Sequence, residues 1–531
     1  MLNLLLFSCA RVGAPNGGTR DSLAPKFLGS NIDTTRLNVS RTVKELRLDF
    51  DEYVMLKDFN KNFNVSPPIK KIKKVIPSNL ANKYVLIQWE DTLQANTTYN
   101  FNFGNAIVDN NESNPLPYFN FAFSTGDKID DLFVSGTVKD AMTLIKENQT
   151  AKDNKMVVGL YKAGENLDYK QKPDYITKVD EENYFELNFL PKGEFVIIAF
   201  DDENQNSVYD AGKEKVSFLK EKITLDSTSV RGLKLKLYPS KKVVKYKESK
   251  AINGGLLMTF EGNPETVEVK SLSEELKDFK VTHAKRSDSV NIWFDAEKSN
   301  LGGTVSKQVK LSYFTPTISD TISVSYKAVK DEFKLSNEAG NLIAPENNFV
   351  INTSLPIENL KTSSWKLESD SIAQDFTAKV SEKNPFKILV NSSFKPTKKY
   401  VLTIPKETVS SYYSSNDKSF QFQFEIDKPE NYGSFTAVIK NKPTAKFWVE
   451  LTNEKGEILY SQFTNASEVS FKNLKPATYI ARIRVDNNGN GFWDEADFAQ
   501  NIAAEDVYIF EKEINVRPLW EIKEDWELTN H

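Results

Sequence analysis

The feature that most limits what this chain can fold into is a recurring pattern of short strands. Segments of five to eight residues alternate apolar and polar side chains, as in residues 45–50, 290–294 and 420–424. Clusters of Asn, Asp, Gly, Pro and Ser separate these segments at short spacing, and helical periodicity is nearly absent. Alternation with a period of two, interrupted by regular turn signals, is typical of β-sandwiches. The pattern therefore predicts an all-β protein.

Chain length and net charge argue against some classes of function. The chain has 531 residues, and its 35 Phe, 20 Tyr and 7 Trp can supply several sandwich cores. A net charge of −4 argues against a strongly basic nucleic-acid binder. The lysine-rich segment 69–75 lacks interleaved aromatic residues, so we interpret it as a strand edge that its lysines protect from pairing. No apolar run is long enough to suggest a membrane-spanning helix.

Four segments near the N-terminus occur in a characteristic order, at residues 50–54, 93–99, 107–116 and 121–126. Their order and spacing resemble the bacterial Ig-like domain of S-layer-type proteins, and the lipoproteins of Bacteroidota that begin with this domain. Within it, alternation predicts that Tyr99, Phe101 and Phe103 face one side of a strand. The polar residues 109–114 form a predicted loop whose side chains bond their own backbone.

An internal repeat lies further along the chain. Residues 134–138 and 185–200 resemble a transthyretin-like or carboxypeptidase-regulatory-like sandwich. The same landmarks recur later at one constant offset, in the pairs Leu190 and Leu474, Phe195 and Tyr479, Asp202 and Asp486, and Asp210 and Asp494. Segment 394–400 echoes segment 93–99. The repeat predicts a linear array of about five small β-sandwiches, Ig-like and transthyretin-like.

The predicted boundaries follow from these landmarks. They are 1–23 for a lipoprotein signal and flexible tether, 24–127 for the Ig-like domain, 131–240 for a transthyretin-like sandwich, 247–335 for a further β-sandwich, 336–428 for an Ig-like sandwich and 431–531 for a second transthyretin-like sandwich.

The only cysteine, Cys9, ends a short apolar stretch and follows the small residue Ser8. This arrangement resembles a bacterial lipobox, in which the cysteine is acylated after the signal peptide is removed. The resemblance implies an exported protein anchored to the outer membrane through Cys9, on either the cell-surface or the periplasmic leaflet. An ordinary signal-peptide end and a truncated core strand are the alternative interpretations.

Residues 486–497 have the order of a twelve-residue calcium loop, with Gly491 where a sharp turn is required. Their flank, residues 479–485, has the pattern of a strand, so no helix–loop–helix is expected. Calcium is the candidate cofactor, and a solvated hairpin without metal is the alternative. The predicted ligands are Asp486, Asn488, Asn490, the carbonyl of Phe492, Asp494 and Asp497.

An earlier loop at the same offset offers a weaker set of ligands. Ser207 stands at the glycine position and is expected to resist a positive φ, and Lys213 stands at position 12. Of the two loops, the later one is therefore predicted to bind calcium more tightly. The weaker candidates are Asp202, Asn204, Asn206 and Asp210.

No catalytic set emerges from the sequence. His283 lies in a predicted strand without a neighbouring nucleophile, and pairs of acids such as Asp201 and Asp202 are expected in turns. We therefore predict a non-enzymatic structural or interaction subunit of an envelope complex, with other outer-membrane proteins as partners. Barrel assembly, secretion and nutrient uptake are the candidate settings. The alternative is a surface glycan-binding lipoprotein whose exposed tryptophans, such as Trp365, Trp493 or Trp520, stack on sugars. A glycoside hydrolase ranks below both.

Overall fold

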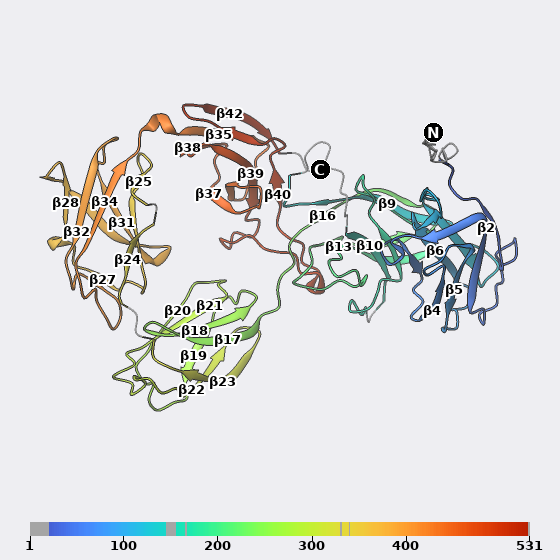
Figure 1. The fold of residues 1–531 in the computed structure, drawn as a ribbon, viewed down its shortest axis with the longest axis horizontal. Helices are drawn as coiled ribbons and strands as arrows, with labels where there is room; N and C mark the ends of the chain where they lie inside the picture. The colour runs from blue at the N-terminus through green and yellow to red at the C-terminus, as the bar shows by residue number, and fades with distance from the viewer. Residues whose placement is uncertain (1–20, 145–154, 165–166, 330–331, 339, 529–531) are drawn as a thin grey trace, which may run out of the picture. The chain divides into compact units, whose positions relative to one another are not determined.

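A computed structural model describes residues 21–144, 155–164, 167–329, 332–338 and 340–528 (Figure 1). The fold is nearly all β, as predicted. The described helices are one turn of α-helix and three short 3-10 segments: α1 (Phe59–Asn62), η1 (Thr362–Ser364), η2 (Pro429–Asn431) and η3 (Phe498–Gln500). Within these ranges no helix has the length and apolar character needed to cross a membrane.

The described residues divide into two compact units. The first takes in residues up to 139, 155–210 and 216–237, and the second takes in 140–144, 211–215 and 238–528. Two β-sandwiches belong to the first unit and three to the second. The domain boundaries expected from the sequence stay predictions.

The first sandwich places the sheet β1-β2-β5-β4 against β3-β6-β8, with β7 paired to β2. Side chains from both sheets, such as Leu48 of β2 and Phe101 of β6, fill its core. Tyr99, Phe101 and Phe103 are all buried, as their alternation predicted. The strands are β1 (Phe27–Ser30), β2 (Glu45–Leu56), β3 (Asn64–Ser66), β4 (Ile72–Ile76), β5 (Asn82–Trp89), β6 (Thr98–Gly104), β7 (Ile107–Asp109) and β8 (Phe119–Ser124).

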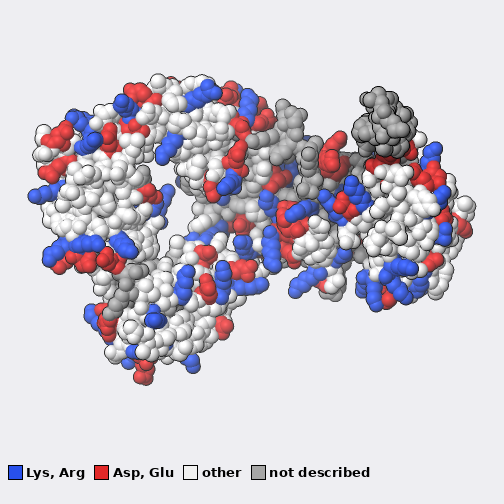
Figure 2. Space-filling model, in the orientation of Figure 1, with Lys and Arg blue, Asp and Glu red and all other residues white. Residues whose placement is uncertain are grey.

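Strand β4 lies at the edge of its sheet and carries the lysines that the sequence assigned to edge protection. Lys73 and Lys74 are exposed. Figure 2 shows basic side chains gathered at the end of the first sandwich where β4 lies. An edge lined with ammonium groups resists pairing with a second edge.

The second sandwich places β11-β10-β13-β14, with β15 also on β13, against β12-β9-β16. Val158 and Ile197 of the first sheet meet Val134 and Leu235 of the second in its core. The strands are β9 (Leu132–Asp140), β10 (Met156–Lys162), β11 (Tyr175–Lys178), β12 (Tyr184–Leu190), β13 (Gly193–Asp201), β14 (Val216–Phe218), β15 (Ile223–Leu225) and β16 (Val230–Leu237).

The third sandwich places β17-β18-β21-β20 against β19-β22-β23. Met258 and Val309 lie in its core, one from each sheet. The strands are β17 (Lys245–Ile252), β18 (Gly255–Glu261), β19 (Glu268–Ser271), β20 (Lys280–His283), β21 (Ser289–Trp293), β22 (Lys307–Phe314) and β23 (Ser319–Tyr326).

The fourth sandwich places β24-β26-β31-β30 against β25-β34-β32-β28-β29, with the short ribbon β27-β33 beside them. Its core also takes in Trp293, which comes from β21 of the third sandwich. The strands are β24 (Leu335–Asn337), β25 (Leu342–Ile343), β26 (Phe349–Thr353), β27 (Asn359–Leu360), β28 (Lys366–Ser369), β29 (Ile372–Ala373), β30 (Phe376–Ser381), β31 (Asn384–Ser392), β32 (Lys399–Ile404), β33 (Val409–Ser410) and β34 (Phe420–Ile426).

The fifth sandwich places β37-β36-β39-β40, with β41 also on β39, against β38-β35-β42. This strand order is the same as that of the second sandwich, strand for strand, which agrees with the repeat predicted from the sequence. The strands are β35 (Gly433–Lys440), β36 (Phe447–Thr452), β37 (Ile458–Thr464), β38 (Glu468–Leu474), β39 (Ala477–Val485), β40 (Val507–Ile509), β41 (Ile514–Val516) and β42 (Glu521–Glu527).

The strand pairing shows where the two repeats differ in length. Phe200 lies opposite Val216 in the second sandwich, and Arg484 lies opposite Val507 in the fifth. The offset that relates Phe200 to Arg484 is therefore smaller than the one that relates Val216 to Val507. The loop between these strands is seven residues longer in the fifth sandwich.

Candidate functional site

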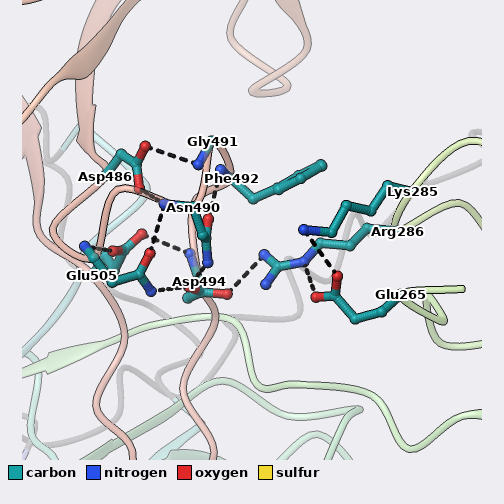
Figure 3. A network of polar contacts seen from close by, with 10 residues as sticks. Glu265, Lys285, Arg286, Asp486, Asn490, Gly491, Phe492, Asp494 and Glu505 are labelled. Atoms are coloured by element: carbon teal, nitrogen blue, oxygen red, sulfur yellow. Dashed lines mark hydrogen bonds and ion pairs between the residues drawn. The ribbon is translucent and has the colours of Figure 1, made fainter. Parts of the chain in front are cut away.

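The last Asp/Asn loop begins where β39 ends. Asp486 directly follows the strand, and its carboxylate is buried. Its Oδ1 accepts a hydrogen bond from the backbone N–H of Asn490 and its Oδ2 accepts one from Gly491, each at 3.0 Å (Figure 3). Gly491 has a φ of 82°, in the left-handed region that glycine enters without a side-chain clash. One buried carboxylate therefore folds the chain back on itself.

Two asparagines complete the loop. Oδ1 of Asn488 accepts from the backbone N–H of Asn490 at 3.0 Å, and Oδ1 of Asn490 accepts from that of Phe492 at 2.8 Å. Their amide nitrogens both donate to Oδ2 of Asp494, at 2.6 and 2.7 Å. Burial disfavours the charged form of Asp494, but the hydrogen bonds from the two asparagines and the charge of Arg286 outweigh it and lower its pKa.

Glu505, which the sequence reasoning missed, closes the loop from the far side. Its Oε1 accepts from the backbone N–H of Asn488 at 3.1 Å and its Oε2 from that of Asp494 at 2.9 Å. Burial raises its pKa in spite of these bonds. Glu505 lies two residues before β40, and Glu214, also buried, lies two residues before β14. Aligning the repeats beyond the longer loop would have revealed this pair.

Arg286 of the third sandwich forms an ion pair with the same loop. Nη1 of Arg286 lies 2.7 Å from Oδ1 of Asp494, and its Nε donates to Oε1 of Glu265 at 2.6 Å (Figure 3). Lys285 lies 3.3 Å from the other oxygen of Glu265. The guanidinium carbon of Arg286 and the Nζ of Lys285 lie 4.7 and 5.1 Å from the centroid of the Phe492 ring. The network thus joins side chains of two sandwiches within the second unit.

Residues in the extension of the later loop bond the segment that leads into the third sandwich. The backbone N–H of Ala496 donates to the carbonyl of Pro239 at 3.1 Å, and that of Lys241 donates to the carbonyl of Ala496 at 2.8 Å. The carboxylate of Asp497 accepts from the backbone N–H of Gln500 at 3.2 Å and so caps η3. Asp497 is thereby engaged outside the hydrogen bonds that Asp486 organises.

The earlier loop, residues 202–210, repeats the same bonds. Asp202 is buried and accepts from the backbone N–H of Asn206 and of Ser207, each at 3.0 Å. Asn204 donates to Asp210 at 2.6 Å, as Asn488 does to Asp494. Ser207 has a φ of 61°, so it adopts the left-handed geometry that a serine was expected to resist. The two backbone N–H bonds to Asp202 hold the serine in the left-handed region.

A cleft of 1210 Å³ opens beside the later loop. Its walls carry aromatic rings, among them Phe260 and Trp493, and charges of both signs. Burial raises the pKa of Glu495 in this cleft, although the charges of Lys242 and Arg286 act in the opposite direction. The cleft therefore combines apolar surface with polar groups, as ligand-binding clefts do.

The fit of the loops to calcium depends on how many of their oxygens point toward one place. Calcium takes six to eight oxygen ligands. Here the side-chain oxygens of Asn488 and Asn490 accept backbone N–H groups, and their amide nitrogens meet Asp494. Within the described ranges no group of three or more His, Cys, Asp or Glu side chains could hold a metal ion. The oxygens do not converge as they stand, and calcium binding by either loop stays a prediction.

The remaining candidates from the sequence lie apart from the loop. Cys9 lies outside the described residues. Nε2 of His283 lies 3.1 Å from the carbonyl of Ser287. Among the tryptophans named for sugar stacking, Trp365 is buried, Trp493 is half-buried and Trp520 is 48% exposed.

An aromatic row that the sequence reasoning missed crosses the outer face of the fifth sandwich. The ring of Trp448 stacks on that of Phe463, with centroids 4.4 Å apart and an interplanar angle of 27°. The guanidinium carbon of Arg484 lies 5.8 Å from the ring centroids of both Trp448 and Trp493. Beneath the row, the buried carboxylate of Glu450 accepts hydrogen bonds from Arg482 and Arg484. The pairing of Trp448 with Phe463 and Arg484 across three strands is what brings the row together.

Comparison with known proteins identifies one part of the chain. Residues 21–125 match the bacterial Ig-like domain family. This agrees with the resemblance found from the sequence of the first sandwich. No match was found among curated proteins.

The solved structures that the chain matches have low sequence identity to it and low TM-scores. The surface layer protein SbsC, domains 1–6, is 11% identical over 93% of this chain and 67% of its own, with a TM-score of 0.16. The Bacteroides ovatus SGBP-B of a mixed-linkage glucan utilization locus, in complex with a heptasaccharide, is 10% identical over 74% of this chain and 97% of its own, with a TM-score of 0.21. The major pilin subunit BcpA of Bacillus cereus is 10% identical over 75% of this chain and 99% of its own, with a TM-score of 0.14.

Proposed function

We propose that the chain is a non-enzymatic lipoprotein, anchored to the outer membrane through acylated Cys9, that acts as a structural or interaction subunit of an envelope complex. The observation that supports this role is the set of contacts joining sandwiches of the second unit. Arg286 of the third sandwich pairs with Asp494 of the fifth, and Ala496 exchanges backbone hydrogen bonds with the segment before the third. Such contacts suit a frame that holds several binding surfaces at fixed spacing.

The partners we propose are other outer-membrane proteins, with a β-barrel machinery as the first candidate. An array of sandwiches offers long surfaces, and several weak contacts made together bind far better than one. Joined sandwiches add to this effect, because surfaces that are already oriented lose less entropy when they bind.

The anchor is tested by cell fractionation. The variant Cys9→Ser should move the protein from the membrane to the soluble fraction and abolish labelling by a fatty-acid probe. Ser8→Ala, which keeps a small residue before the cysteine, is the matched control and should stay in the membrane. Membrane association of Cys9→Ser equal to that of the native chain would contradict the proposal.

The scaffold role is tested by recovery of partners. The native chain, purified from detergent-solubilised outer membrane after cross-linking, should carry envelope proteins with it in fixed ratio. Arg286→Ala should lower that recovery several-fold while the protein remains in the membrane, and Lys298→Ala, on an exposed lysine of the same sandwich, should not. Recovery of the chain alone would argue against a subunit role.

A surface glycan-binding function is the second candidate. It is favoured by the aromatic row of Trp448, Phe463 and Trp493, since sugars stack on aromatic faces that remain accessible. Calorimetric titration with neutral oligosaccharides is the test. Trp448→Ala should weaken binding about tenfold or more, and Trp520→Ala, on an exposed tryptophan elsewhere, should leave it unchanged. Equal binding by both variants would exclude the row as the site.

A further inference from the structure

Strand β37 is an exposed edge without charge. It lies at the end of the sheet β37-β36-β39-β40, and in the described part of the chain no strand pairs with its other side. Its sequence, ILYSQFT, contains no Asp, Glu, Lys, Arg or Pro. Leu459 is 49% exposed and Phe463 is 44% exposed. Charges and prolines are the usual means by which proteins keep a sheet edge from pairing with another edge.

Two other edge strands of the chain are protected in that way. Strand β4 carries Lys73 and Lys74, and the edge strand β17 carries Lys245, Lys247 and Lys250. In β37 the only irregularity is at Leu459, where the register with β36 shifts by one residue. The regular and unprotected part of this edge is therefore residues 460–464.

The repeat shows what happens at the equivalent edge of the second sandwich. There the edge strand β11 is covered, because the backbone N–H of Ile176 donates to the hydroxyl of Ser66 in the first sandwich at 3.1 Å. Ile176 lies opposite Gly159, and Ser461 lies opposite Glu450 at the same place in the repeat. The N–H of Ser461 therefore points away from the sheet, as does that of Phe463 two residues on.

We propose that β37 pairs with β37 of a second copy of this chain, antiparallel, about a two-fold axis at Gln462. Ser461 of each copy lies opposite Phe463 of the other, and the two pairs exchange four backbone hydrogen bonds. Gln462 lies opposite its own counterpart on the axis, while its side-chain amide donates to the carbonyl of Ser470 in β38 at 2.7 Å. The two five-stranded sheets become one continuous sheet of ten strands.

The chemistry of the strand favours a second copy over other occupants. The side chains of the strand itself bring no like charges together when it meets a second copy, although Nζ of Lys446 lies 5.6 Å from the ring centroid of Phe463. The alternation places Phe463 and its neighbour Trp448 of both copies on one face. Pairing of one edge with itself consumes both edges, so the assembly closes at two copies. An interface of five-residue strands is small, and we expect a dissociation constant of about 1–100 µM. The pairing does not depend on the proposed function.

Sedimentation equilibrium of the full chain tests the proposal, with Cys9→Ser as the background so that neither lipid nor a native thiol intervenes. Between about 1 and 200 µM the mass should rise from 60.3 kDa toward twice that value. Phe463→Lys should raise the dissociation constant at least about tenfold, since it sets two cations across the axis. Phe314→Lys, at a phenylalanine 56% exposed at the end of β22, should not change it. A monomer at every concentration, association beyond two copies, or unchanged association of Phe463→Lys would overturn the proposal.

Cross-linking provides a second readout that does not depend on affinity alone. In the same background, Gln462→Cys should form a disulfide-linked dimer on mild oxidation, because the axis brings the two thiols together. Gln423→Cys, on an exposed side chain of β34, is the matched control and should remain monomeric. Ser461→Pro removes the outward N–H without adding charge and should suppress the dimer of Gln462→Cys several-fold. Cross-linking of Gln462→Cys no faster than that of Gln423→Cys would overturn the proposed axis.

Discussion

The two Asp/Asn loops fold around the same hydrogen bonds and are used differently. Only four of their nine residues agree, the aspartates at both ends and the two asparagines between them. Five hydrogen bonds made by these four residues recur in both loops. Both loops are followed by residues that bond the segment 239–241, Gly212 and Glu214 after the earlier loop and Ala496 after the later one. The later loop adds seven residues before its next strand and an ion pair with Arg286. The shared residues set the turn, and the additional ones connect it to a neighbouring sandwich.

The largest effect is expected at the first aspartate of each loop. Asp486→Ala removes a buried carboxylate that accepts two part-buried hydrogen bonds, from the backbone N–H groups of Asn490 and Gly491, at a cost of about 2–4 kcal/mol. Asp202→Ala should cost a similar amount because it removes the same bonds. Hydrogen exchange of β39 and β13, respectively, measures the two losses. A large cost in one loop beside a negligible cost in the other would show that the loops are not equivalent.

The two acids that flank the later loop should respond to pH in opposite senses. The pKa of Asp494 is lowered from 3.8, so its stabilisation is present above pH 3.8 and is lost as the pH falls through its folded-state pKa. The pKa of Glu505 is raised from 4.5, so its contribution is fully present below pH 4.5 and is lost as the pH rises through its folded-state pKa.

Urea denaturation of Asp494→Asn and Glu505→Gln beside the native chain, between pH 3 and 7, measures this contrast. The deficit of Asp494→Asn should shrink toward low pH. Glu505→Gln should gain on the native chain as the pH rises. Deficits with the same pH dependence in both variants would refute the assignment.

Calcium binding should change the stability of the chain by less than the loss of the first aspartate does. If the later loop binds the ion more tightly, calcium at tenfold excess over its dissociation constant stabilises the fifth sandwich by about 1.4 kcal/mol. Thermal melting with calcium and with chelator measures the shift, which Asp486→Ala should abolish and Asp202→Ala should spare. A shift that survives Asp486→Ala would mean that the ion binds elsewhere, and no shift would leave both loops as hydrogen-bonded hairpins.

The smallest change in stability is expected for substitutions at the residue with a positive φ in each loop, Gly491 or Ser207. Gly491→Ser should cost about 1 kcal/mol of folding stability, because a serine is strained at a positive φ. Ser207→Gly should change stability by less than that. Glycine relieves strain in the folded chain but also gains entropy in the unfolded chain, and the two effects oppose each other. Paired urea titrations of the two variants measure the difference. If Gly491→Ser instead destabilised the chain as much as Asp486→Ala does, the later loop would tolerate no side chain there.

The sequence predicts the two Asp/Asn loops better than it predicts the residues that contact them. Alternation locates the strands, and the repeat of Asp and Asn locates both loops, because these signals are local. Glu505 could not be found from the constant offset between the two repeats, because the seven added residues change that offset before Glu505 is reached. Arg286 leaves no spacing signal at all, since its pairing with Asp494 depends on how one sandwich packs near another. The left-handed φ of Ser207 depends on the bonds to Asp202, which override the preference of the residue alone.

Trp293 bears on how this protein could be divided or recombined. The residue belongs by sequence to β21 of the third sandwich, yet it is buried in the core of the fourth, with its ring centroid 6.0 Å from that of Phe386. A fragment cut at the sequence boundary between them would lose a tryptophan from its interior, and emptying such a site costs about 3–5 kcal/mol. The third and fourth sandwiches should therefore be kept together in any engineered fragment, which would run from β17 to β34.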